Sequence, residues 1–174
     1  MKLFIAFFAL VVWSAQSLAC DETCKREKAM QEHGVSFPGY LNADFCKTTS
    51  NDFLLRDIKD LEKYRSDHLL SGHKGGMNNI RKLLEQRKEW LIECDEYLRL
   101  TGQGRVFRNE ETTEVIFTAI DRVTGQLNGM IYNGDRSVTV TSGIDVAEQR
   151  FDTLFNELEK HKTDLQLRGQ LVIR

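Results

Sequence analysis

The sequence contains a single proline, Pro38, in 174 residues, so long stretches lack the residue that most strongly interrupts helices. Beyond the N-terminus, apolar residues recur at steps of three and four and do not alternate, which is the spacing of buried helix faces. The sequence also lacks repeats and low-complexity segments. These features predict an all-α fold, an antiparallel bundle of about four to five helices.

The sequence lacks the motifs of common enzymes. It contains no Ser-His-Asp order, no Gly-rich phosphate loop and no nucleophile elbow. The five-residue spacing of His68 and His73 does not place both on one helical face, and no Cys-x-x-Cys or His-Glu-x-x-His motif accompanies them. We therefore predict a protein that is not an enzyme, with no catalytic residues, no metal and no cofactor.

Neither sign of charge dominates the chain. It carries 24 basic and 26 acidic residues, a formal net charge of −2 at pH 7. Proteins that bind nucleic acid or anionic membranes through charge have a marked excess of lysine and arginine. We therefore expect no nucleic-acid partner.

The N-terminus has the pattern of a secretory signal peptide. Lys2 gives a short positive start, residues 3–13 form an apolar run, and Ser17 and Ala19 place small residues before a cleavage site. The apolar run is shorter than the roughly 20 residues that span a bilayer. We predict a signal peptide over 1–19, a single helical domain over 20–174, and no transmembrane span in the mature chain.

Cys20 would be the first residue after this cleavage. Lipoprotein signals place an apolar residue and then two small ones before the cysteine, whereas Ser17 and Leu18 stand in the opposite order. Cleavage without a lipid is the prediction. The alternative is a structural, envelope-associated helical protein with a lipid anchor at Cys20. Because no asparagine lies in an Asn-x-Ser/Thr sequon, the pattern favours a bacterial periplasm or secretion.

The mature chain would keep all four cysteines. An even number in an oxidising compartment predicts two disulfides, with three possible connectivities among Cys20, Cys24, Cys46 and Cys94. The first two are spaced Cys-x-x-x-Cys, which is not the thioredoxin spacing. On a helix their sulfurs would lie one turn apart, so both could reach across to different partners. The N-terminal segment is therefore expected to be stapled by disulfide bonds.

Capping and periodicity signals place five helices along the chain. The predicted ranges are 20–33, 49–70, 77–100, 109–130 and 142–165. Thr49 supplies the start signal of the second helix, which leaves Cys46 in the preceding loop. Arg87 interrupts the apolar face of the third helix and must pair with a carboxylate or reach water. Segments 133–143 and 170–174 could hold short strands, but we treat them as irregular.

The stretch TGQGRVFRNEE, residues 101–111, mixes glycines with cationic and aromatic side chains. Arginine and aromatic residues are enriched at protein interfaces, so Arg105, Phe107 and Arg108 are the candidate partner-binding residues. In the alternative, Val106 and Phe107 fold back and cap the bundle. The sequence predicts an exported, non-catalytic protein that binds a protein partner, as an inhibitor, immunity protein or chaperone does. Partner identity and oligomeric state stay open.

Overall fold

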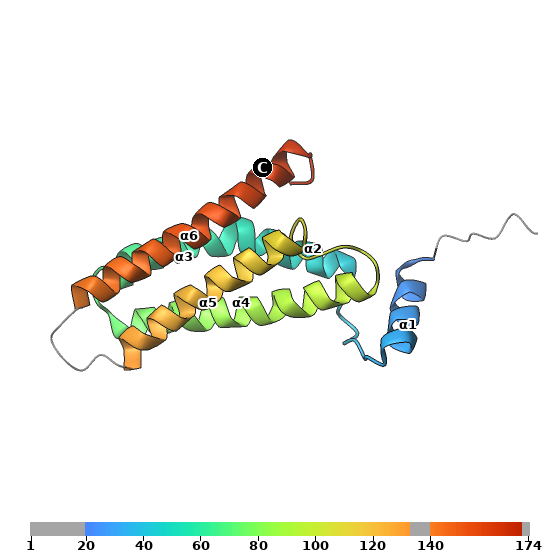
Figure 1. Ribbon diagram of the computed structural model, residues 1–174, viewed down its shortest axis with the longest axis horizontal. Coiled ribbons are helices and arrows are strands. Elements are labelled where there is room, and N and C mark those ends of the chain that lie inside the picture. The colour runs from blue at the N-terminus through green and yellow to red at the C-terminus, as the bar shows by residue number, and fades with distance from the viewer. Residues whose placement is uncertain (1–19, 133–139, 172–174) are drawn as a thin grey trace, which may run out of the picture. The chain divides into compact units, whose positions relative to one another are not determined.

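The computed structural model describes residues 20–132 and 140–171, and every regular element in them is helical (Figure 1). The predicted all-α fold is therefore confirmed. The signal peptide predicted for 1–19 lies outside the described residues. So do most of the first possible strand, at 133–143, and the end of the second, at 170–174. The elements are α1 Glu22–His33, α2 Ala43–Asp52, η1 Phe53–Asp57, α3 Ile58–Tyr64, η2 Arg65–Leu69, α4 Lys74–Leu100, α5 Glu110–Tyr132 and α6 Val140–Leu167.

The chain divides into two compact units at Phe37. In the first, α1 begins where the side chain of Asp21 accepts a hydrogen bond from the backbone N–H of Cys24 (2.9 Å), and it ends at Gly34, whose φ of 64° suits glycine. Cys20 and Cys24 form a disulfide with a Cα–Cα distance of 5.4 Å. The two sulfurs bond to each other and do not reach across to other segments. The prediction of a single domain over 20–174 stays a prediction.

The second unit opens with one long helix, and it begins earlier than the sequence analysis predicts. α2 starts at Ala43 because the side chain of Asn42 accepts a hydrogen bond from the backbone N–H of Phe45 (2.8 Å), which caps the helix. Cys46 is therefore helical and buried, not in a loop. The elements α2, η1, α3 and η2 follow without a break, as a helix with two π-helical turns.

The predicted apolar faces form the core of this second unit. Helix α5 contacts both α4 and α6, α2 contacts α4, and neighbouring long helices run in opposite directions (Figure 1). The fully buried side chains of α4, α5 and α6 include Leu84, Leu91, Cys94, Ile116, Ile120, Leu127, Phe151 and Leu154. No helix in the described part of the chain combines the length and apolarity needed to cross a bilayer.

Arg87 lies on the apolar face of α4, and it has the carboxylate partner that a charge at this position requires. Its Nε lies 2.5 Å from Oδ2 of Asp57, a carboxylate with only 4% exposure at the end of η1. Its guanidinium carbon also lies 4.7 Å from the centre of the Trp90 ring. A buried arginine beside a carboxylate and an aromatic face avoids the cost of an isolated charge.

Candidate functional site

Asp95 on α4 holds the connection between α4 and α5. Oδ1 of this buried carboxylate accepts hydrogen bonds from Nε of Arg105 (2.8 Å) and the backbone N–H of Val106 (2.9 Å), and Oδ2 accepts one from Nη2 of Arg105 (2.6 Å). The hydrogen bonds to Asp95 raise the pKa of Arg105 above its ordinary value. Gly102 and Gly104 have φ values of 67° and 103°, so this tight path requires glycine. Arg105 is thus committed to an intramolecular ion pair.

Phe107 lies in the interior, where the alternative interpretation places it. Its side chain is 3% exposed, and its ring meets the ring of His161 edge-on with the centroids 5.2 Å apart. The Phe117 ring lies on another side, at 6.1 Å. Phe107 therefore caps the end of the bundle, and only a small part of it remains accessible.

Arg108 is the most accessible of the three predicted partner-binding residues. Its side chain is 49% exposed, and Nη1 lies 3.5 Å from Oδ1 of Asp164 on α6. A half-exposed ion pair at this distance contributes little to folding and is easily exchanged for another carboxylate. Arg105, Phe107 and Arg108 are therefore close together on one connection, but their side chains contact different residues: Asp95, His161 and Asp164.

A second site, which the sequence analysis missed, lies between α2 and α4. We call it the aromatic pocket. It has a volume of about 530 Å³ and is lined by Tyr40, Phe45, Thr48, Thr49, Asp52, Arg56, Arg87 and Trp90. Tyr40 and Trp90 are large aromatic side chains with 53% and 36% exposure. One feature of the sequence could have indicated this site. Trp90 does not fall on the apolar face of its helix, so its large ring is not needed for the core.

Local contacts fix the rings of the aromatic pocket. The Tyr40 ring packs edge-on against Phe45, with centroids 5.3 Å apart, and its hydroxyl donates a hydrogen bond to Oε2 of Glu93 (3.1 Å). This hydrogen bond raises the pKa of Tyr40, so the phenol stays protonated. On the other wall, the Arg87 guanidinium stacks over Trp90. Both exposed rings are therefore held in place by contacts within the chain.

The Cys46–Cys94 disulfide joins the two helices that carry the aromatic pocket. The two Cα atoms lie 5.2 Å apart, and both cysteines are buried. Cys46 follows Phe45 directly on α2, and Cys94 lies one helical turn after Trp90 on α4. The covalent link therefore limits how far the two walls of the pocket can move apart.

A search against protein-family models, curated proteins and solved structures finds no match to this chain. The described residues contain no group of three or more side chains arranged to hold a metal ion.

Burial of His161 makes the folded state sensitive to mildly acidic solution. Desolvation lowers the pKa of His161 below its ordinary value of 6.5, and the positive charge of Arg108 lowers it further, while Asp164 opposes both. The unfolded chain therefore binds a proton at a pH where the folded chain does not, so unfolding becomes easier as pH falls below about 6.5. We expect the melting temperature to fall between pH 7 and 5, and His161→Gln to reduce this slope. Equal slopes for both proteins would contradict the assignment.

Proposed function

We propose that the protein is an exported, non-catalytic binding protein that captures a protein partner through the aromatic pocket. The observation that carries the proposal is the pairing of two exposed rings, Tyr40 and Trp90, with Arg56 and Arg87 in one concave site. Tryptophan, tyrosine and arginine dominate the energetics of protein interfaces. A hydrophobic or aromatic side chain of the partner would enter between the rings, and its polar groups would meet Arg56, whose side chain is 63% exposed.

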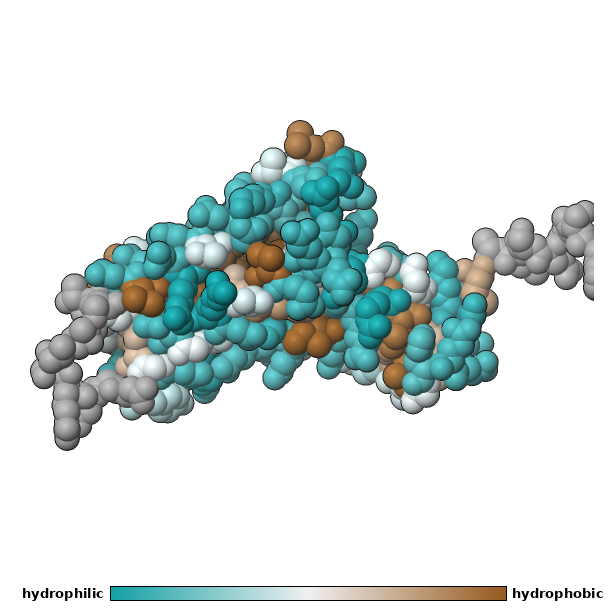
Figure 2. Space-filling view, in the orientation of Figure 1, coloured by the Kyte–Doolittle hydropathy of each residue, from teal (hydrophilic) through white to brown (hydrophobic). Residues whose placement is uncertain are grey.

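The rigidity of the pocket supports a binding role. Ordering side chains on association costs about 0.5–1.5 kcal/mol for each immobilised side chain. Here the disulfide, the stacked Arg87 and the hydrogen bond from Tyr40 to Glu93 have already ordered the walls. Elsewhere, the face in view in Figure 2 is mostly hydrophilic, with apolar side chains in small separate patches. A compact anchoring site suits such a surface better than a broad apolar interface.

The two disulfides indicate an oxidising, extracytoplasmic environment. The finer location that we propose, a bacterial periplasm or secretion, is supported by the signal-peptide pattern. The Cys20–Cys24 bond also bears on the rival proposal of a lipid anchor. A lipid would occupy the Cys20 sulfur as a thioether, and that sulfur could then form no disulfide. The intact mass of the exported protein decides between them: a diacylglycerol on Cys20 would support the tethered alternative.

Truncating the rings of the aromatic pocket tests the proposed function. The partner would first be identified by co-purification from the native host and then titrated as a pure protein. Trp90→Ala and Tyr40→Ala should each weaken its binding about 30-fold, which corresponds to roughly 2 kcal/mol. The control is Ile92→Ala, an apolar side chain of α4 with 43% exposure that does not line the pocket.

Arg108→Ala provides the second arm of this experiment. If the partner contacts the connection between α4 and α5, as the sequence suggests, this variant should lose binding at an almost unchanged melting temperature. If the aromatic pocket is the contact surface, Arg108→Ala should bind like the parent protein. Parent-like binding by both Trp90→Ala and Tyr40→Ala would contradict the assignment of the pocket.

A further inference from the structure

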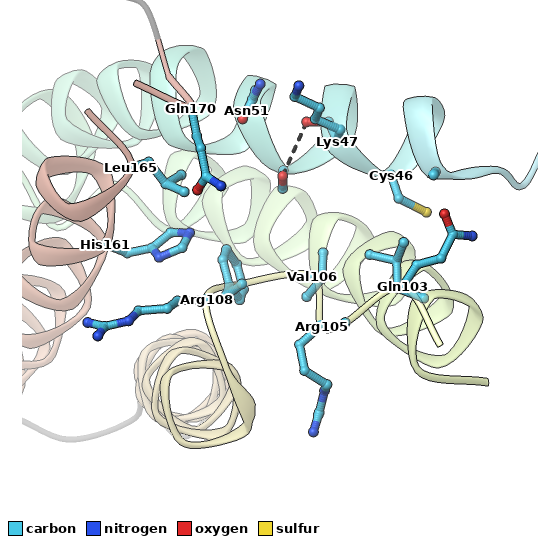
Figure 3. A pocket seen from close by; sticks show the side chains of 15 residues that line it. Cys46, Lys47, Asn51, Gln103, Arg105, Val106, Arg108, His161, Leu165 and Gln170 are labelled. Atoms are coloured by element: carbon cyan, nitrogen blue, oxygen red, sulfur yellow. Dashed lines mark hydrogen bonds between the residues drawn. The ribbon is translucent and has the colours of Figure 1, made fainter. Parts of the chain in front are cut away.

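A second cavity lies beside the connection between α4 and α5, and we call it the loop pocket. Its volume is about 420 Å³, at the small end of the range for ligand sites. One wall comes from α2, another from residues 103–108 and a third from the end of α6 and Gln170, which follows it (Figure 3). It is distinct from the aromatic pocket, because no residue lines both.

The ionisable side chains that line the loop pocket are all lysine, arginine or histidine. They are Lys47, Arg105, Arg108 and His161, and no carboxylate contributes to the lining. The two arginines form ion pairs with Asp95 and Asp164, and Figure 3 shows both side chains extending away from α2. Lys47 is exposed and has no ion pair within the described parts of the chain. In Figure 3 its side chain extends away from Val106, and its flexible four-carbon stem allows the ammonium group to turn toward the opening of the pocket.

The remaining lining combines an apolar surface with hydrogen-bonding groups. Val106, Phe107 and Leu165 supply apolar atoms. Asn51 lies on α2, and the side chain of Gln170 extends toward Leu165 and His161 (Figure 3). A ligand pocket typically pairs such an apolar lining with a few polar groups that fix orientation. The ligand should therefore have an apolar part and one negatively charged end.

His161 supports this interpretation. Its side chain is 5% exposed and lines the pocket, and its Nδ1 is buried without a hydrogen-bond partner among the described residues. A buried polar atom left without a partner is costly and uncommon in folded proteins. A neutral imidazole adds no charge to the pocket, so Lys47 remains the group that selects for the negatively charged end of the ligand.

We propose that the loop pocket binds a small carboxylate with a short apolar chain. The carboxylate pairs with the ammonium group of Lys47 at the opening, and the apolar chain lies on Val106, Phe107 and Leu165. This assignment does not depend on the aromatic pocket or on the protein partner, so either one can fail without the other.

Calorimetric titration with hexanoate tests the proposal, with hexan-1-ol and hexylamine as neutral and cationic analogues of the same length. Hexanoate should bind saturably, and at least about tenfold more tightly than either analogue, because a hydrogen bond to a charged group is stronger than one between neutral groups. Lys47→Gln should weaken hexanoate binding at least about tenfold. Lys63→Gln is the matched control, since Lys63 is exposed on α3 and does not line the pocket.

Leu165→Trp provides an independent test by filling the cavity. This variant should lose hexanoate binding while its circular dichroism spectrum and its melting temperature remain near those of the parent protein, because Leu165 is only partly buried. The proposal is overturned if hexanoate shows no saturable binding to the parent protein. It is also overturned if Lys47→Gln and Lys63→Gln bind hexanoate equally well, or if hexylamine binds as tightly as hexanoate.

Discussion

Replacing Asp95 with alanine should lower the free energy of unfolding by about 3–5 kcal/mol. The substitution removes the carboxylate that accepts hydrogen bonds from the Arg105 guanidinium and from the backbone N–H of Val106. The Arg105 side chain is only 15% exposed, and its remaining acidic neighbours, Glu110 and Glu114, lie farther away at 3.5 and 3.7 Å. Urea denaturation followed by circular dichroism measures the loss.

Two further variants separate the contributions to this effect. Asp95→Asn keeps an amide oxygen that can accept from the Val106 N–H but removes the charge, so it should lose less stability than the alanine variant. Asp121→Ala breaks an exposed ion pair with Lys88 (2.6 Å), and should cost no more than about 1 kcal/mol. If Asp95→Ala and Asp121→Ala unfold at the same urea concentration, Asp95 does not hold the connection as described.

Removing the Cys46–Cys94 disulfide should cost about 4 kcal/mol. The two cysteines are 48 residues apart in sequence, so the bond closes a long loop and restricts the unfolded chain strongly. The double variant Cys46→Ala/Cys94→Ala should therefore melt roughly 10 °C below the parent protein in differential scanning calorimetry. Because the bond also joins the two walls of the aromatic pocket, the same variant should bind the proposed protein partner more weakly.

The other disulfide supplies the matched control. Cys20 and Cys24 are four residues apart, and they lie in the first compact unit, whereas the bundle belongs to the second. Their joint replacement by alanine should leave the melting of the bundle close to that of the parent protein. A melting temperature that falls as far in this variant as in Cys46→Ala/Cys94→Ala would argue against the assigned roles.

The buried faces of the helices could be predicted because they depend only on the local spacing of apolar residues. Steps of three and four between apolar residues place Leu84 and Leu91 on one face of α4 whatever the rest of the chain does. The need for a partner at Arg87 was also predictable, since a charge on a buried face cannot stay unpaired. Its partner was not, because Asp57 lies 30 residues earlier and only the packing of η1 on the bundle brings it close.

The sites were less predictable, because they depend on contacts between distant segments. The sequence analysis began the second helix at Thr49 and missed its true start at Ala43. Asn42, which caps the helix, follows a Pro-Gly turn closely, so the sequence around it indicates a loop. The disulfide pairing required knowing that Cys46 is helical and faces α4. Trp90 could be recognised as lying off the seam, but Tyr40, its neighbour in the aromatic pocket, comes from a loop with no periodic signal.

The connection between α4 and α5 has little freedom to change its length. Surface loops generally accept insertions and deletions because little depends on the position of each residue. Here Arg105 and Val106 meet one carboxylate on α4, and the next residue, Phe107, meets His161 on α6. Adding or removing one residue among these would displace at least one of them from its partner. Related sequences, where they exist, should therefore vary in length elsewhere and keep this spacing.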